Sequence, residues 1–256
     1  MPTPPPPATG RRPARNARPR LDDLLVERGL AADRAEARAL VLARAVLIAG
    51  APAAAAAAHV DAGVALSLRE RGRYASRGGE KLAGALERCA VSVEGARCLD
   101  AGASAGGFTD CLLQRGASHV TAVDVAYGAL APHLRADLRV TVLERTNVRL
   151  LAPLQPSVDL AVLDLSFISL TAVLPAVLRS VRPGGDLLAL VKPQFEAARA
   201  QVPRGGVVEE ATVHASAVAR VALWAINAGL RVRGVIRSPL LGPSGNREFF
   251  LWLRRP

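Results

Sequence analysis

The sequence predicts an α/β protein, in which a small α+β domain precedes a doubly wound domain with a seven-stranded, mainly parallel sheet and an antiparallel last strand. Two observations carry this prediction. Strand candidates alternate with helical stretches through most of the chain, which is typical of a parallel sheet with crossover helices. The last two strand candidates are joined only by SPLLGPSGN (238–246), which leaves no room for a crossover helix, so the final strand is expected to run antiparallel.

Size and composition indicate a globular, basic protein. The chain has 256 residues, enough for one or two domains, and 50% of them are hydrophobic, which is ample for a packed core. The formal net charge of +11 suits a polyanionic partner such as RNA or DNA, with a generic basic surface as the alternative. Only two of the 33 basic residues are lysine, Lys81 and Lys192, and the others are all arginine. An ammonium can lose its proton when it is buried or set beside another cation, whereas a guanidinium stays charged.

The cysteines and histidines show no metal-ligand spacing. Cys89, Cys98 and Cys111 follow no C-x-x-C pattern, and the four histidines are scattered along the chain. These patterns predict neither a disulfide framework nor a metal site, and they suggest a reducing compartment.

The N-terminal residues predict an arm rather than a targeting signal. Residues 1–10 are rich in proline and lack the apolar core of a signal peptide, and no segment reaches the roughly 20 apolar residues that span a bilayer. RRPARNARPR (11–20) adds five arginines. We therefore expect a cytoplasmic protein without membrane contact, and a disordered basic arm over residues 1–19 that either touches phosphates or has no role.

Residues 20–68 predict a compact module of two helices and two strands. RLDDLLVERGL places three leucines on one helical face and ends at Gly29. A second helix follows Asp33, which can cap it, and gives way to a short strand in VLIAG (46–50). After the low-complexity run APAAAAAAH, apolar residues alternate over 60–68 and predict a further strand.

A linker over 69–77 leads to the larger domain, 78–256, which begins with a helix in SRGGEKLAGAL. The seven strand candidates follow in order as ARCLDAG (96–102), HVTAVDV (119–125), RVTVLE (139–144), VDLAVLDL (158–165), GDLLALVK (185–192), LRVRGVI (230–236) and EFFLWLR (248–254).

The first of these strands runs through a glycine loop, CLDAGASAGGFTD, into a helix, so that the backbone can approach a ligand closely at the helix N-terminus. The G-x-S-x-G-G spacing resembles motif I of S-adenosylmethionine (SAM) enzymes. Asp124 ends the next strand 22 residues beyond Gly102, where a carboxylate can bind both ribose hydroxyls of a nucleoside. An NAD site is the alternative, which the loop spacing and the antiparallel last strand disfavour. The candidate cofactor-binding residues here are Asp100, Gly102, Ser104, Gly106, Gly107 and Asp124.

The third and fourth strands add two further candidates. Asn147 in ERTNVR follows the third strand, where SAM enzymes contact the adenine; a simple turn residue is the alternative. Asp164 ends the fourth strand at the carboxyl edge of the sheet, where open α/β folds bind ligands, and is a candidate for both cofactor binding and catalysis. Neither Asn-Pro-Pro-Tyr, which suits methylation of an amino group, nor Pro-Cys, which suits attack on a pyrimidine carbon, stands there.

Both lysines stand in motifs of the larger domain. Lys81 lies in its first helix, Lys192 closes the fifth strand and Glu248 opens the last one, so that with Asp164 they give the order Lys-Asp-Lys-Glu. This order resembles the catalytic tetrad of RNA ribose 2′-O-methyltransferases. Methyl transfer to a ribose hydroxyl benefits from a base and from groups that align the oxygen, and a lysine beside a second lysine can accept the proton. Lys192 is the candidate base, Asp164 and Glu248 would position its amine and the ribose, and Lys81 would hold the substrate. Separate surface ion pairs are the alternative.

The chain resembles the TlyA family, also called haemolysin A, over nearly its whole length. The resemblance rests on RYAS (73–76), SRGGEKL, LDAGASAGGFTD, ERTNVR, DLSFISL, LVKPQFE and GNREFFL. It implies a class I, Rossmann-like SAM-dependent methyltransferase domain of the FtsJ type. It also implies 2′-O-methylation of cytidine in ribosomal RNA (16S, 23S or both), with ribosomal RNA or ribosomal subunits as partner. Glu80 departs from the leucine or histidine that other members often have, and its carboxylate could alter the charge of Lys81.

Residues 20–68 resemble the RNA-binding domain of small-subunit ribosomal protein S4, with a small helical cap as the alternative. In that domain a helix pair presents arginines to folded RNA. The resemblance implies phosphate contacts by Arg20, Arg34, Arg38 and Arg44. Arg73 and Arg77 are further RNA-binding candidates, at the link that the TlyA resemblance implies couples the two domains.

Two other classes of function stay open at this point. A non-catalytic ribosome-binding or assembly factor could retain the cofactor fold, but it would have no need of lysine where arginine would serve. A membrane-active haemolysin is disfavoured because the sequence shows no export signal, no spanning segment and no strongly amphipathic basic helix that lacks a role in the core. The sequence leaves the modified nucleotide and the oligomeric state open.

Overall fold

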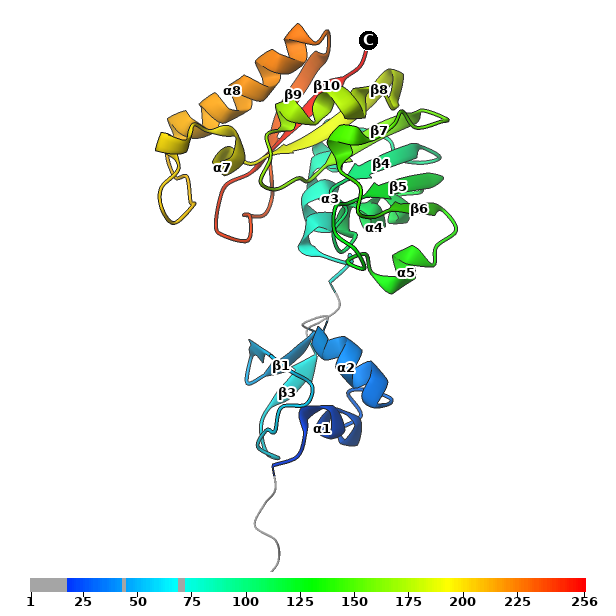
Figure 1. The fold of residues 1–256 in the computed structure, drawn as a ribbon, viewed down its shortest axis with the longest axis vertical. Helices are drawn as coiled ribbons and strands as arrows, with labels where there is room; N and C mark the ends of the chain where they lie inside the picture. The colour runs from blue at the N-terminus through cyan, green and yellow to red at the C-terminus, as the bar shows by residue number, and fades with distance from the viewer. Residues whose placement is uncertain (1–17, 43–44, 69–71) are drawn as a thin grey trace, which may run out of the picture. The chain divides into compact units, whose positions relative to one another are not determined.

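The computed structural model describes residues 18–42, 45–68 and 72–256 (Figure 1). Most of the predicted basic arm, Arg44 and the first residues of the predicted linker lie outside the described residues. The chain divides into two compact units, Met1–Arg71 and Gly72–Pro256. None of the helices among the described residues is both long and apolar enough to cross a membrane.

The first unit packs two helices on a three-stranded antiparallel sheet. Its elements are α1 (Leu21–Glu27), α2 (Arg34–Leu42), β1 (Val46–Ile48), β2 (Ala51–Pro52) and β3 (Leu66–Leu68), with strand order β2-β1-β3. Both predicted helices and the strand at 46–50 are confirmed. The strand predicted over 60–68 is wrong for its first half: the Asp61 carboxylate accepts a hydrogen bond from the backbone N–H of Gly63 (2.7 Å), which turns the chain there. The low-complexity run instead supplies β2.

The second unit has the predicted seven-stranded sheet, with the order β6-β5-β4-β7-β8-β10-β9. Strands β4 to β8 pair in parallel, whereas β10 runs antiparallel to both of its neighbours, as the short connection before it requires. The strands are β4 (Arg97–Ala101), β5 (His119–Val123), β6 (Val140–Leu143), β7 (Val158–Leu163), β8 (Val181–Val191), β9 (Arg231–Arg237) and β10 (Phe249–Arg254).

Helices cover both faces of this sheet, because alternate residues of each strand point to opposite sides. One core contains Leu82 and Leu112 with Val162 and Leu188, and the other contains Leu174 and Val221 with the neighbouring strand residues Ala161, Leu163 and Leu187. The helices are α3 (Arg77–Cys89), α4 (Gly107–Gln114), α5 (Pro132–Arg135), α6 (Leu174–Leu178), α7 (Pro193–Glu196) and α8 (Ala211–Asn227), with 3-10 turns η1 (Val148–Leu150), η2 (Leu170–Ala172) and η3 (Arg199–Gln201).

The predicted linker (69–77) is shorter in the structure, since its second half packs into the second unit. The backbone oxygen of Arg73 accepts a hydrogen bond from Gln114 (2.8 Å), and the backbone N–H of Ala75 donates one to Asp110 (2.7 Å). The Tyr74 ring is buried, and Ser76 caps α3 by accepting from the backbone N–H of Gly78. A buried aromatic and a helix cap therefore fix the start of the helix that carries Lys81.

Candidate active site

The loop between β4 and α4 can only be made with glycine at its turns. Gly102 has a φ of +93°, and a Cβ there would lie 2.4 Å from the backbone oxygen of Asp164. Gly106, with a φ of +92°, leads into α4, and a Cβ on it would meet the Leu134 side chain. Glycine at these two positions therefore lets the loop turn and pack closely against its neighbours, and it places the loop against the end of β7 where Asp164 stands.

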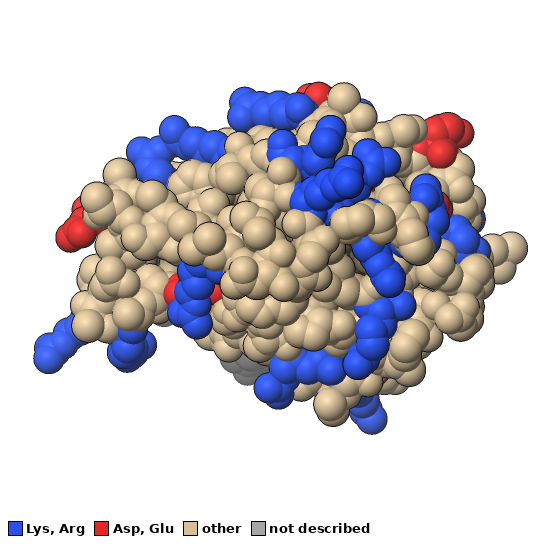
Figure 2. Space-filling model, turned by 90° about the horizontal axis from the view of Figure 1, so that it is seen from above, with Lys and Arg blue, Asp and Glu red and all other residues tan. Residues whose placement is uncertain are grey.

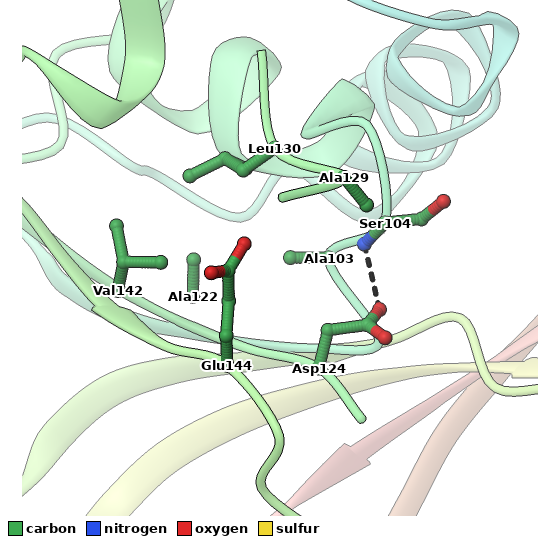
Figure 3. A pocket seen from close by; sticks show the side chains of 8 residues that line it. All are labelled: Ala103, Ser104, Ala122, Asp124, Ala129, Leu130, Val142 and Glu144. Atoms are coloured by element: carbon green, nitrogen blue, oxygen red, sulfur yellow. Dashed lines mark hydrogen bonds between the residues drawn. The ribbon is translucent and has the colours of Figure 1, made fainter. Parts of the chain in front are cut away.

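Asp124, directly after β5, is held by the same loop. Its two carboxylate oxygens accept hydrogen bonds from the backbone N–H groups of Ser104 (2.7 Å, Figure 3) and Ala126 (2.8 Å). A carboxylate oxygen can accept more than one hydrogen bond, so both oxygens can still bind hydroxyl groups. The backbone therefore fixes the Asp124 carboxylate in place for a ligand.

A small pocket, about 10 Å³ in volume, lies beside Asp124. Figure 3 shows Leu130 and Val142 facing each other across it, while the carboxylate of Glu144 points into the space between them and Asp124. Glu144 accepts from the backbone N–H of Gly128 (2.9 Å), and the Arg135 guanidinium that pairs with it lowers its pKa. The pocket is lined by Ala103, Ser104, Ala122, Asp124, Ala129, Leu130, Val142 and Glu144.

Sequence reasoning missed Leu130 and Glu144 as lining residues. The sequence does contain a pattern that indicates Glu144, because it follows β6 directly, as Asp124 follows β5. The ends of neighbouring parallel strands meet at one edge of a sheet, so the two carboxylates are expected there together. Leu130 lies in a connection without a motif. Asn147, predicted to contact adenine, is not among the lining residues; its side-chain oxygen accepts from the backbone N–H of Arg149 (3.1 Å) and caps η1.

Asp100 is a buried carboxyl group beneath the glycine loop. It accepts a hydrogen bond from the Thr109 hydroxyl (2.7 Å), while its second oxygen has no hydrogen-bond partner among the described residues. Burial raises the pKa of Asp100 to about 7, because a charge is poorly solvated there. Burial therefore favours the neutral form of this carboxyl group more than it would for an exposed aspartate.

The four predicted tetrad residues form two ion pairs. Lys81 Nζ lies 2.6 Å from Glu248 Oε2, with both side chains buried, and Lys192 Nζ lies 2.7 Å from Asp164 Oδ1. Lys192 also donates to the Ser166 hydroxyl (3.0 Å). Each lysine faces a carboxylate, and none of the contacts among the described residues joins the two lysines, so the pairing differs from the lysine–lysine contact that the sequence suggested.

Strand register brings the two pairs to one edge of the sheet. Asp164 follows β7, whose last residue pairs with Ala189 of β8; Lys192 follows β8; and Glu248 precedes β10, whose first residue, Phe249, pairs with Val191. Lys81 reaches this edge from α3. The same edge carries Gly102 and Asp124 at the ends of β4 and β5, so the pocket and the ion pairs share one side of the sheet.

The loop after Asp164 presents an exposed aromatic ring. The Phe167 side chain is 91% exposed, and its φ of +63° is an unusual conformation for a bulky residue. Its ring lies 5.1 Å from that of Phe195, and the buried Glu196 holds the loop by accepting from the Ser169 hydroxyl and the backbone N–H of Leu170 (both 2.6 Å). Strain and exposure at one residue beside Lys192 indicate a functional position. DLSFISL supports the family resemblance, but the motif alone did not indicate an exposed ring at Phe167.

The predicted RNA-binding arginines of the first unit are organised by two acidic residues of α1. Arg20 makes two hydrogen bonds with Asp22 (2.7 and 2.9 Å), Arg38 approaches the same carboxylate, and Arg34 pairs with Asp23. The pKa of Asp22 lies well below its usual range because it accepts from both guanidinium groups. The three arginines are partly exposed and share one helix pair, while Arg44 lies outside the described residues.

The two arginines at the link have different partners. Arg73 lies over the Tyr74 ring, 5.3 Å from its centre, and Arg77 donates to the backbone oxygen of Leu241 (3.1 Å). Basic side chains are spread widely over the face of the molecule in Figure 2, where acidic ones are few. Within the part of the chain that the structure describes, no group of histidine, cysteine and acidic side chains is arranged to hold a metal ion.

Comparison with known proteins gives close relatives over most of the chain. Residues 74–255 match the model of the FtsJ-like methyltransferase family. The 16S/23S rRNA (cytidine-2′-O)-methyltransferase TlyA of Mycobacterium tuberculosis is 52% identical over 242 residues, which cover 93% of this chain and 90% of the relative.

Solved structures of other proteins resemble this chain in fold. A “putative hemolysin” from Streptococcus thermophilus has a TM-score of 0.72 at 40% identity, covering 93% of this chain and 89% of that one. An S-adenosylmethionine-dependent methyltransferase from Mesorhizobium loti has a TM-score of 0.53 at 18% identity over 68% of this chain and 98% of its own, a likeness of fold alone.

Proposed function

Because the chain belongs to the FtsJ-like methyltransferases, and within them to the TlyA family, we propose that it transfers a methyl group from SAM to the 2′-hydroxyl of a cytidine in ribosomal RNA. The observation that carries this proposal is the placement of the Asp164–Lys192 and Lys81–Glu248 pairs at the sheet edge that also holds the glycine loop. The choice of cytidine in ribosomal RNA as the substrate rests on the similarity to the M. tuberculosis relative, whose name specifies that substrate. A cytoplasmic location follows from that substrate.

The residues of the pocket suit the adenosine part of SAM. Leu130 and Val142 offer apolar surfaces to a base, Asp124 is fixed to accept hydrogen bonds from ribose hydroxyls, and the glycine loop, which contacts Asp124 through the backbone N–H of Ser104, would hold the rest of the ligand. The bound cofactor would supply a methyl group on a positively charged sulfur. Gly102 lies against Asp164, so the far end of the ligand would reach the two ion pairs.

At the ion pairs the chain's own residues would hold the ribose and receive its proton. Asp164 and Ser166 fix the Lys192 side chain, which leaves one direction of its nitrogen for the 2′-oxygen. As the oxygen forms its bond to the methyl carbon, the hydroxyl proton would pass to Lys192 while Lys192 gives one of its own protons to the Asp164 carboxylate 2.7 Å away, and from there to water. The bond between methyl carbon and sulfur would break and leave its electron pair on the sulfur. Lys81, held by Glu248, would position the substrate.

The first unit would bind folded ribosomal RNA. Its exposed arginines are fixed by Asp22 and Asp23, so they are oriented as hydrogen-bond donors at little cost in side-chain entropy. The likeness of residues 20–68 to the ribosomal protein S4 domain supports the same role. Arg73 and Arg77 would extend these contacts onto the second unit.

Asp124→Ala is expected to weaken SAM binding about 10- to 100-fold, because the variant removes the charged acceptor for the ribose hydroxyls. Isothermal titration of the protein with SAM measures this directly, without RNA. Asp137→Ala removes another half-buried loop carboxylate, whose only ion pair among the described residues is with Arg139; it is the matched control and should bind SAM as the unmodified protein does. Equal affinities in all three proteins would contradict the assignment of Asp124.

Phe167→Ala is expected to lower methyl transfer to RNA by about 10-fold or more while leaving SAM binding intact, since an exposed ring beside the site is suited to stack on an unpaired base, a contact worth about 1–3 kcal/mol. Phe167→Tyr keeps the ring and should retain activity. Steady-state kinetics on RNA, with SAM affinity measured in parallel, tests both variants; full activity of Phe167→Ala would refute the stacking role.

The proposed function is tested by incubating the full chain with tritiated SAM and naked ribosomal RNA, each ribosomal subunit, or the assembled ribosome, followed by mapping of the modified nucleotide. Label at a cytidine 2′-oxygen is the expected result. Label at a base would overturn the ribose assignment, and binding of ribosomal particles without any label would favour a non-catalytic ribosome-binding factor.

A further inference from the structure

A groove beside the loop that precedes Glu248 carries three arginines that the proposed function leaves without a role. It is lined by Arg88 of α3, Arg237 at the end of β9 and Arg247, with the segment 238–241 between them. Its volume is about 360 Å³, which is within the range of roughly 300–1,000 Å³ that is usual for ligand sites. The groove is therefore large enough to receive a nucleotide-sized group.

The three positive charges are not neutralised. None of these guanidinium groups forms an ion pair with any of the described residues, in contrast to Arg135 and Arg182, which have carboxylate partners. Arg88 donates to the backbone oxygen of Arg237 (3.4 Å), which ties α3 to the end of β9. Like charges gathered around a hollow repel one another, and an anion bound there would relieve that repulsion.

The wall between the arginines includes the apolar side chains of Pro239, Leu240 and Leu241, which favours a nucleotide over a free inorganic anion. Pro239 and Leu241 are exposed, and Gly84 of α3 packs directly under Pro239, since a Cβ there would lie 2.9 Å from its ring. Phosphates suit guanidinium groups, while sugars and base faces suit apolar and partly apolar surfaces. A strand of RNA offers both in alternation.

The groove adjoins the ion pair of Lys81 and Glu248. Arg247 directly precedes Glu248, and Arg88 follows Lys81 by seven residues, which is two turns or about 10 Å along α3. Gly242, within the loop, packs against Glu248, because a Cβ on it would lie 2.5 Å from Oε1. A polyanion in the groove would therefore lie close to the substrate bound at the ion pairs.

We propose that this groove binds the phosphodiester backbone of the RNA substrate beside the nucleotide that is methylated. The inference rests on the proposed function, and it adds a second RNA contact, on the catalytic unit itself. Arg237 and Arg247 are the informative positions, because their guanidinium groups make no hydrogen bond to any described residue and can be changed without removing an internal contact.

The test compares two double variants of the full chain with the unmodified protein. Arg237→Gln/Arg247→Gln removes two charges from the groove. Arg231→Gln/Arg254→Gln is the matched control, because these two exposed arginines pair across the other end of β9 and β10 and also lack ion pairs among the described residues. Affinity for transcribed 16S and 23S ribosomal RNA is measured by fluorescence anisotropy without SAM, over a series of salt concentrations.

The groove variant should bind RNA about 10- to 100-fold more weakly, with a salt slope reduced by about 1.5, while the control stays near the unmodified protein. Equal loss in both variants would overturn the proposal in favour of a diffuse basic surface, and unchanged binding in the groove variant would overturn it directly. If the groove variant binds naked RNA normally but no longer binds ribosomal subunits, the proposal is overturned, and the groove binds an acidic surface of a ribosomal protein instead. If the groove variant loses RNA affinity but the unmodified protein transfers no methyl group, the proposed function is wrong and the assignment of the groove as an RNA-binding site is kept.

Discussion

Lys192→Arg is expected to lower methyl transfer by about 10³-fold, the scale on which a positioned general base contributes to catalysis. Arginine keeps the positive charge opposite Asp164, so it should preserve the ion pair, the fold and the binding of RNA. It cannot accept the proton of the 2′-hydroxyl, since a guanidinium is protonated throughout the usable pH range. The loss should therefore appear in kcat for labelling of ribosomal RNA, with RNA affinity and SAM affinity close to those of the unmodified protein.

Lys81→Arg is the matched comparison, and it should be the milder of the two substitutions. Lys81 contributes a compact charge held by Glu248, and an arginine can make the same pair. Full activity of Lys192→Arg would show that Lys192 is not the general base, without affecting the assignment of the chain to its family. Equal losses in both variants would mean that the two lysines share one role.

Glu248→Leu is expected to destabilise the protein by about 3–5 kcal/mol, because it leaves the buried ammonium of Lys81 without its partner. For a chain of this size, that corresponds to a fall of about 10 °C in Tm. Thermal unfolding followed by circular dichroism measures the change. Methyl transfer should be lost as well.

The double variant Lys81→Met/Glu248→Leu separates the two effects. Replacing both members of a buried pair by apolar side chains of similar size is commonly neutral or stabilising, so the Tm should return most of the way to that of the unmodified protein. Activity should not return. A double variant that is as unstable as Glu248→Leu would show that the loss of stability does not come from an unpaired buried charge on Lys81. A double variant that still transfers methyl groups would exclude Lys81 and Glu248 from catalysis.

Much of the fold could be predicted because local patterns and global constraints agree. Apolar runs separated by helical stretches require a parallel sheet, and the short 238–246 connection permits only an antiparallel last strand. The position of Asp164, Lys192 and Glu248 at one edge follows from the same logic, since each directly adjoins a strand end. Which residues pair across that edge was not predictable, because side-chain partners depend on register and on the approach of α3.

The features that sequence reasoning missed depend on backbone conformation or on packing between distant segments. Phe167 matters because its φ is positive and its ring is exposed, and the motif DLSFISL in which it stands does not reveal either property. The groove combines residues of α3 with the β9–β10 connection, which are about 150 residues apart. The linker was predicted to extend to residue 77, whereas the structure buries Tyr74 and uses Ser76 as a helix cap.

The scarcity of lysine has a practical consequence for chemical labelling. The chain has two side-chain amines, both are almost completely buried, and each is engaged by a carboxylate at the proposed catalytic edge. An acylating reagent that consumes primary amines will therefore modify few sites besides the terminal amine. Slow acylation of Lys192, followed by mass spectrometry, would report on opening of the catalytic edge alone, without the background that a lysine-rich surface creates.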